Sequence, residues 1–157
     1  MNATLSLLGR AGLSLIFIIS GWGKIAGYAA TQGYMESMGV PGALLPLVIA
    51  LELGGGLAIL AGVATRWVAL AIAAFSVVSA LVFHADFGDQ MQAISFWKNI
   101  AIAGGFLLLA ANGPGPLSLE ARLRRNPPKG LEMALAITEA RRVELGEVQT
   151  RFAGRVV

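Results

Sequence analysis

Four long apolar stretches, separated by short polar segments, dominate the chain. They cover residues 5–23, 41–65, 67–84 and 96–113. Each is close to the roughly 20 residues that a helix needs to cross a hydrocarbon core of about 30 Å at 1.5 Å per residue. The pattern therefore predicts an all-α integral membrane protein, folded as a four-helix bundle.

The last apolar stretch gives this signal most clearly. Between Asn99 and Leu119 there are 21 residues without a charge, and Pro114 and Pro116 then end the helix. The span opens on Lys98 and Asn99. A charged side chain and an amide thus begin a helix that is otherwise apolar.

The composition changes abruptly after Asn126. Residues 127–157 mix basic and acidic side chains, and their apolar positions make only a patchy face at helical spacing. We therefore divide the chain into a four-span membrane domain, residues 1–126, and a short cytoplasmic tail, residues 127–157, with a surface helix.

The overall composition supports the membrane class. Hydrophobic residues make up 56% of the 157 residues, charged residues 13%, and the mean hydropathy is +0.71, whereas about a quarter of a soluble domain is charged. The chain has no cysteine, so redox chemistry would need a bound cofactor. The net charge of +3 is modest, and we interpret it as an orientation signal and not as a nucleic-acid footprint.

Basic residues are shared unequally between the two ends of the predicted bundle. One end holds Arg10, Arg66, Arg122, Arg124 and Arg125. The other end holds two lysines and three acidic residues, namely Lys24, Lys98, Glu36, Asp86 and Asp89. The positive-inside rule then predicts that both termini are cytoplasmic, which agrees with an even number of spans.

Several short motifs stand in order along these spans. They are Arg10 in the first span, SGWGKIAG at 20–27, LELGGGLAILAG at 51–62, His84, and FWKNIAIAGGFLLLA at 96–110. Together they resemble the DoxX family of small four-helix inner-membrane proteins. The resemblance extends from Leu5 to Asn126, and it implies a multi-pass protein of a bacterial inner (plasma) membrane.

The resemblance implies that the protein acts near membrane redox complexes, but it does not establish a reaction. The family takes its name from a subunit associated with a quinone-reactive sulfur-oxidising system, and other members look like partners in membrane redox or oxidative-stress complexes. We therefore expect a redox-associated protein of the lipid bilayer that binds a small apolar ligand or a partner subunit, or forms a homo-oligomer. No cofactor follows from the residues alone; a quinone is the candidate, and no enzymatic activity is established.

Five polar residues within or beside the spans form the candidate ligand-binding group: Lys24, Glu52, His84, Lys98 and Asn99. Glu52 follows Pro41 by 11 residues, hence by about 16 Å of helix, and lies near the bilayer midplane. A charge there costs about 2.5–3.5 kcal/mol on insertion scales, so Glu52 should face the bundle and pair with a cation. Lys98 is the preferred partner and Lys24 the next.

Three interpretations of this polar group remain open. The first is a structural pair of Glu52 and Lys98 that fixes helix register, with Asn99 bonded to a neighbouring backbone. The second is a pocket in which Lys98, His84 and Glu52 hold the oxygens of a quinone-like ring. The third is transport of a small solute or proton, for which repeats or broken helices would be expected and neither is evident.

Two further sets of residues have predicted roles. The small residues expected at close helix contacts are Gly54, Gly55, Gly56, Gly104 and Gly105. The basic residues expected to reach lipid headgroups are Arg10, Arg122, Arg124 and Arg125. No metal site is expected, because His84 is the single histidine and there is no cysteine.

Overall fold

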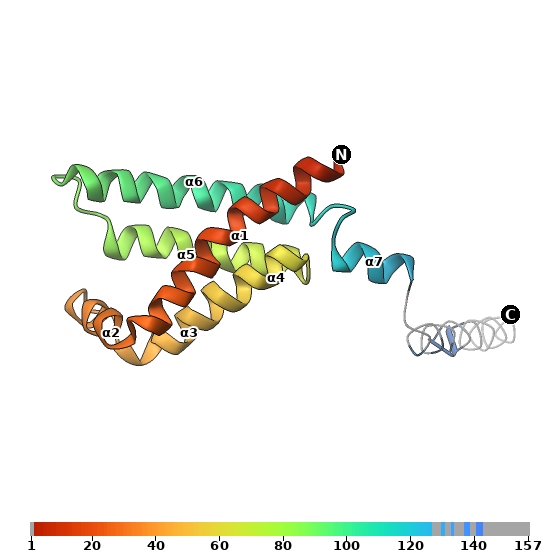
Figure 1. The fold of residues 1–157 in the computed structure, drawn as a ribbon, viewed down its shortest axis with the longest axis horizontal. Coiled ribbons are helices and arrows are strands. Elements are labelled where there is room, and N and C mark those ends of the chain that lie inside the picture. The colour runs from red at the N-terminus through yellow and green to blue at the C-terminus, as the bar shows by residue number, and fades with distance from the viewer. Residues whose placement is uncertain (1, 127–129, 131–132, 134–136, 139–140, 143–157) are drawn as a thin grey trace, which may run out of the picture. The chain divides into compact units, whose positions relative to one another are not determined.

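Figure 1 shows the fold in a computed structural model, which describes residues 2–126, 130, 133, 137–138 and 141–142. Every regular element in these residues is a helix. The chain divides into two units, Met1–Ala121 and Arg122–Val157, and the four long helices belong to the first unit. Most of the tail predicted at residues 127–157 lies outside the described residues.

Four helical segments of the first unit are long and apolar enough to cross a membrane. They are α1 (Ala3–Ala26), the segment Gly42–Ala61, α5 (Thr65–Phe83) and α6 (Gln90–Asn112). The all-α class with four such helices is therefore confirmed. The last helix begins before the predicted residue 96 because Asp89 caps it, accepting hydrogen bonds from the backbone N–H groups of Met91 and Gln92 at 2.7 and 3.2 Å.

The polar connector after α1 folds into a short helix, α2 (Tyr28–Ser37). Met35 of this helix is buried, and the ring of Tyr34 stacks on Phe83 of α5 with 5.6 Å between centroids. The connector is thus packed against the end of the bundle and forms part of the wall around its interior.

The second apolar segment is not one regular helix. A 3₁₀ turn (Gly42–Leu44) leads into α3 (Leu45–Ile49), a π-helical turn (Ala50–Gly54) follows, and α4 (Gly55–Ala61) completes the segment. Glu52 lies at the centre of the π turn. Single π turns inside α-helices occur frequently at functional sites, so Glu52 is a candidate functional residue.

The long helices pack as two pairs, and both pairs contribute side chains to one core. α5 runs along α6, while α1 packs on α4 and on the π turn (Figure 1). Phe17 of α1 and Phe106 of α6 meet edge to face, with ring centroids 5.3 Å apart. The remaining core side chains are Ile59, Ala69, Ile72, Ala73 and Ala103.

Glycines bring α1 close to the second segment. An added Cβ at Gly21 would lie 2.7 Å from the backbone nitrogen of Leu53, and one at Gly56 would lie 2.8 Å from the Ile18 side chain. Among the predicted packing glycines, Gly55 and Gly105 likewise face neighbouring side chains. The other two, Gly54 and Gly104, face open space within the described residues, so their role in packing stays a prediction.

We expect Gly21→Ala to destabilise the bundle and Gly104→Ala to be nearly neutral. The first methyl group meets the backbone of the π turn, and overpacking of this kind costs about 1–3 kcal/mol. The second enters open space. Thermal melts of the detergent-solubilised variants measure the difference, and equal melting temperatures would contradict the close contact of α1 with Leu53.

Candidate functional site

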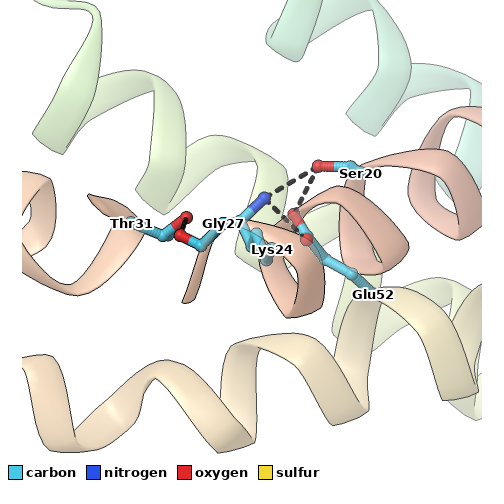
Figure 2. Close-up of polar contacts among 5 residues, drawn as sticks. All are labelled: Ser20, Lys24, Gly27, Thr31 and Glu52. Atoms are coloured by element: carbon cyan, nitrogen blue, oxygen red, sulfur yellow. Dashed lines mark hydrogen bonds and ion pairs between the residues drawn. The ribbon is translucent and has the colours of Figure 1, made fainter. Parts of the chain in front are cut away.

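A buried ion pair links α1 to the π turn. The ammonium of Lys24 lies 2.7 Å from Oε2 of Glu52, and the two side chains are 24% and 6% exposed (Figure 2). Glu52 thus pairs with the second of its two expected partners, and the preference for Lys98 is wrong.

Ser20 completes a three-residue cluster with this pair. It lies one helical turn before Lys24 and accepts a hydrogen bond from the lysine ammonium at 2.7 Å. Its own hydroxyl donates to Oε1 of Glu52 at 3.3 Å (Figure 2). Ser20 was not among the residues predicted from the sequence, although a serine four positions before an intramembrane lysine shares its helix face.

The other three predicted ligand residues have different surroundings. His84 ends α5, and its Nδ1 lies 2.7 Å from Oε1 of Gln92 on α6, where an Nδ1–H would donate. Asn99 donates to the carbonyl of Ser95, one turn earlier on its own helix, at 3.0 Å. Lys98 is exposed and has no ion pair or hydrogen bond within the described residues.

Two cavities meet at the ion pair. The smaller, about 200 Å³, is lined by all five predicted ligand residues, together with Ser20, Ser79 and apolar side chains of α1, α5 and α6. The larger, about 330 Å³, extends between α2, the second segment and α5, and its walls are mostly apolar. Both cavities are lined by Lys24, Glu52, Phe75, Ser79 and His84.

The junction of α1 and α2 borders the larger cavity. Thr31, which lines it, donates a hydrogen bond to the carbonyl of Gly27 at 3.0 Å (Figure 2). Tyr34 and Met35 add apolar wall from the same helix. The site is therefore built from every long element of the first unit and from the connector helix α2.

Arg10 does not reach outward as a headgroup contact would require. Its side chain is 2% exposed, and its two terminal nitrogens donate to the carbonyls of Pro114 and Leu117, each at 2.7 Å. The prediction is wrong because the loop after α6 supplies carbonyl acceptors that hold the guanidinium inside the bundle. The predicted headgroup contacts of Arg122, Arg124 and Arg125, which are exposed, stay predictions.

A second contact reinforces this end of the first unit. The carboxylate of Glu120 accepts a hydrogen bond from the backbone N–H of Thr65 at 2.7 Å, and the Glu120 N–H donates to the carbonyl of Gly62 at 3.1 Å. The turn between α4 and α5 is thereby tied to the chain after α6. We call Arg10, Glu120 and their four carbonyl and N–H partners the terminal clasp.

The described residues contain no group of three histidine, cysteine, aspartate or glutamate side chains that could hold a metal ion. The ionisable groups around the two cavities instead offer one carboxylate, two ammonium groups, one imidazole and the phenol of Tyr34. Such a set can donate hydrogen bonds to ligand oxygens and can exchange protons with them.

Comparison with known proteins places the chain in a family. A sequence model described as DoxX matches residues 5–85, which include Lys24, Glu52 and His84. The chain belongs to the DoxX family. It is 53% identical over 119 residues to "Inner membrane protein YqjF" of Escherichia coli (strain K12), a match that covers 76% of this chain and 92% of the relative. It is 39% identical over 125 residues to "Inner membrane protein YphA" of the same organism, over 75% and 89% of the two chains.

No solved structure matches this DoxX-family chain. The family match ends at residue 85, before Lys98 and Asn99, so the α6 side of the smaller cavity lies outside it. The ion pair and the π turn lie within it.

We expect Lys24→Met to destabilise the protein more than Glu52→Gln. Removing one partner of a fully buried pair costs about 3–5 kcal/mol, and the cost here should be smaller because Lys24 is 24% exposed. Lys24→Met leaves the buried carboxylate without its cation, whereas Glu52→Gln leaves an ammonium that is nearer the surface. Denaturant titration in detergent measures both losses.

The double variant Lys24→Met/Glu52→Leu provides the matched control. It removes both charges and should recover most of the lost stability. A double variant as unstable as Lys24→Met would show that the pair is not the source of the effect.

Proposed function

We propose that this DoxX-family chain is an inner-membrane protein that binds a small apolar ligand with polar oxygens, such as a quinone, and works beside a membrane redox partner. The observation that carries the proposal is the junction of the two cavities at the Lys24–Glu52 pair. The polar groups thus lie together on one part of the wall of an otherwise apolar space, which is typical of a small-molecule site.

The residues present fit a quinone-like ring in size and chemistry. The larger cavity, about 330 Å³, falls in the range of about 300–1,000 Å³ that small-molecule pockets occupy. Lys98 and Asn99 supply N–H donors for ring oxygens, and Phe75 supplies an aromatic face. A bound quinone would contribute two-electron redox chemistry, while His84 and Glu52 would accept or release protons at their side chains.

One observation favours transport as a second candidate. The second segment is interrupted by a π turn at the polar centre, and broken helices of this kind often hold substrates in transporters. A purely structural subunit is the third candidate, in which the ion pair serves only helix register. Ligand binding separates it from the first two.

The cavity proposal is tested with 1,4-naphthoquinone and two matched variants. Val82 lines the larger cavity, whereas Val77 lies on the same helix and lines neither cavity. Val82→Phe should fill part of the space and weaken binding about tenfold or more, and Val77→Phe should leave it unchanged. Equilibrium dialysis with protein in phosphatidylcholine nanodiscs measures affinity, with empty nanodiscs as the control for partitioning. Binding no greater than to empty nanodiscs would support the structural candidate instead.

We propose that both termini face the cytoplasm, and the cysteine-free chain makes this simple to test. Single cysteines replace Asp89, before α6, and Val63, which is exposed in the turn between α4 and α5. Thr65 at the same turn is buried and would be a poor site. An impermeant maleimide added to intact cells should label the Asp89→Cys protein and not the Val63→Cys protein. The reverse pattern would overturn the orientation.

A further inference from the structure

The smaller cavity carries more positive than negative charge. Three formally charged side chains line it: Lys24, Glu52 and Lys98. Lys24 and Glu52 neutralise each other at 2.7 Å, and His84 adds no negative charge. Lys98 has no carboxylate within 4.0 Å among the described residues. One positive charge on the cavity wall therefore remains uncompensated.

The position of Lys98 makes this charge significant. It lies eight residues after Gln90, about 12 Å along α6, and its side chain, although exposed, lines the smaller cavity. Ionisable side chains of membrane-spanning helices usually face a cavity or the bundle and pair with an opposite charge. The chain provides no such partner for Lys98 in its described part, so a ligand is the remaining source within the cavity.

Resting on the proposed function, we propose that the ligand is an amphiphilic monoanion whose carboxylate or phenolate oxygen binds Lys98. Its apolar body occupies the larger cavity, against Leu44, Val48 and Val82. The two cavities share five wall residues, so one molecule can extend through both. An anionic oxygen forms a charge-assisted hydrogen bond with the ammonium, whereas a neutral ligand leaves the charge in place and a cation is repelled.

Two sources could supply this chemistry. One is a fatty acid from the bilayer, and the other is a ring acid or ionised ring hydroxyl related to a quinone. The larger cavity, about 330 Å³, is at the lower end of the range for small-molecule sites, and the smaller, about 200 Å³, is below it, so the two suit a single chain or a single ring system. The two sources share the anionic oxygen, and the test separates them by their apolar bodies.

The test compares each acid with a neutral amide of similar shape. 2-Naphthoate is paired with 2-naphthamide, and palmitate, which represents the bilayer source, is paired with palmitamide. Binding is measured by equilibrium dialysis to the full chain in phosphatidylcholine nanodiscs, which carry no net lipid charge. We expect at least one acid to bind at least about tenfold more tightly than its own amide, the usual size of one charged hydrogen bond.

The variants assign this preference to Lys98. Lys98→Gln should abolish it, Lys98→Arg should preserve it, and Arg124→Gln, which removes an equal charge from the exposed helix α7 (Leu119–Arg125), should leave it unchanged. Tighter binding of naphthoate than of palmitate would identify the ring source, and the reverse would identify the bilayer source.

Two results are distinguishable as failures. If naphthoquinone binds in a Val82-dependent manner while neither acid binds better than its own amide, Lys98 does not bind an anionic ligand and this inference is overturned alone. If neither naphthoquinone nor the anions bind above empty nanodiscs, the proposed function fails with it.

Discussion

The burial of one carboxylate governs the arrangement of this bundle. Glu52 lies in the middle of an apolar segment, where an isolated charge is unfavourable. An ion pair with Lys24 at 2.7 Å and a hydrogen bond from the Ser20 hydroxyl at 3.3 Å stabilise it there. Both partners are on α1. The close approach of Gly21 to Leu53, directly beside the carboxylate, is what brings their helix near enough. The close contact of the two helices and the ion pair between them therefore depend on each other.

The region around the ion pair also contains unfilled space. The π turn that carries Glu52 interrupts the regular packing of the second segment, and cavities of about 200 and 330 Å³ adjoin the ion pair. The buried pair, the irregular turn and the adjoining space are the observations on which the proposed binding site rests.

The sequence predicted the class of fold and which five polar residues lie around one cavity, but not their pairings. The length of an apolar run is read directly from the order of residues, so the four spans could be recognised. The proximity of Lys24, Glu52, His84, Lys98 and Asn99 followed from the placement of these five residues at or toward the same half of the bilayer. The choice between Lys24 and Lys98 depends on helix rotation, which run length does not determine. Arg10 was misplaced for a similar reason, since the path of the loop after α6 is a tertiary feature.

The terminal clasp also has a consequence for biosynthesis. Arg10 and the carbonyl of Pro114 are 104 residues apart in sequence. At a synthesis rate of about 5–20 residues per second, the guanidinium waits roughly 5–20 s before its final acceptors emerge from the ribosome. During that interval water, lipid headgroups or the insertion machinery must solvate it. The hydrogen bonds of Arg10 therefore form only after the last span has been made, and closure of the clasp is a late step of assembly.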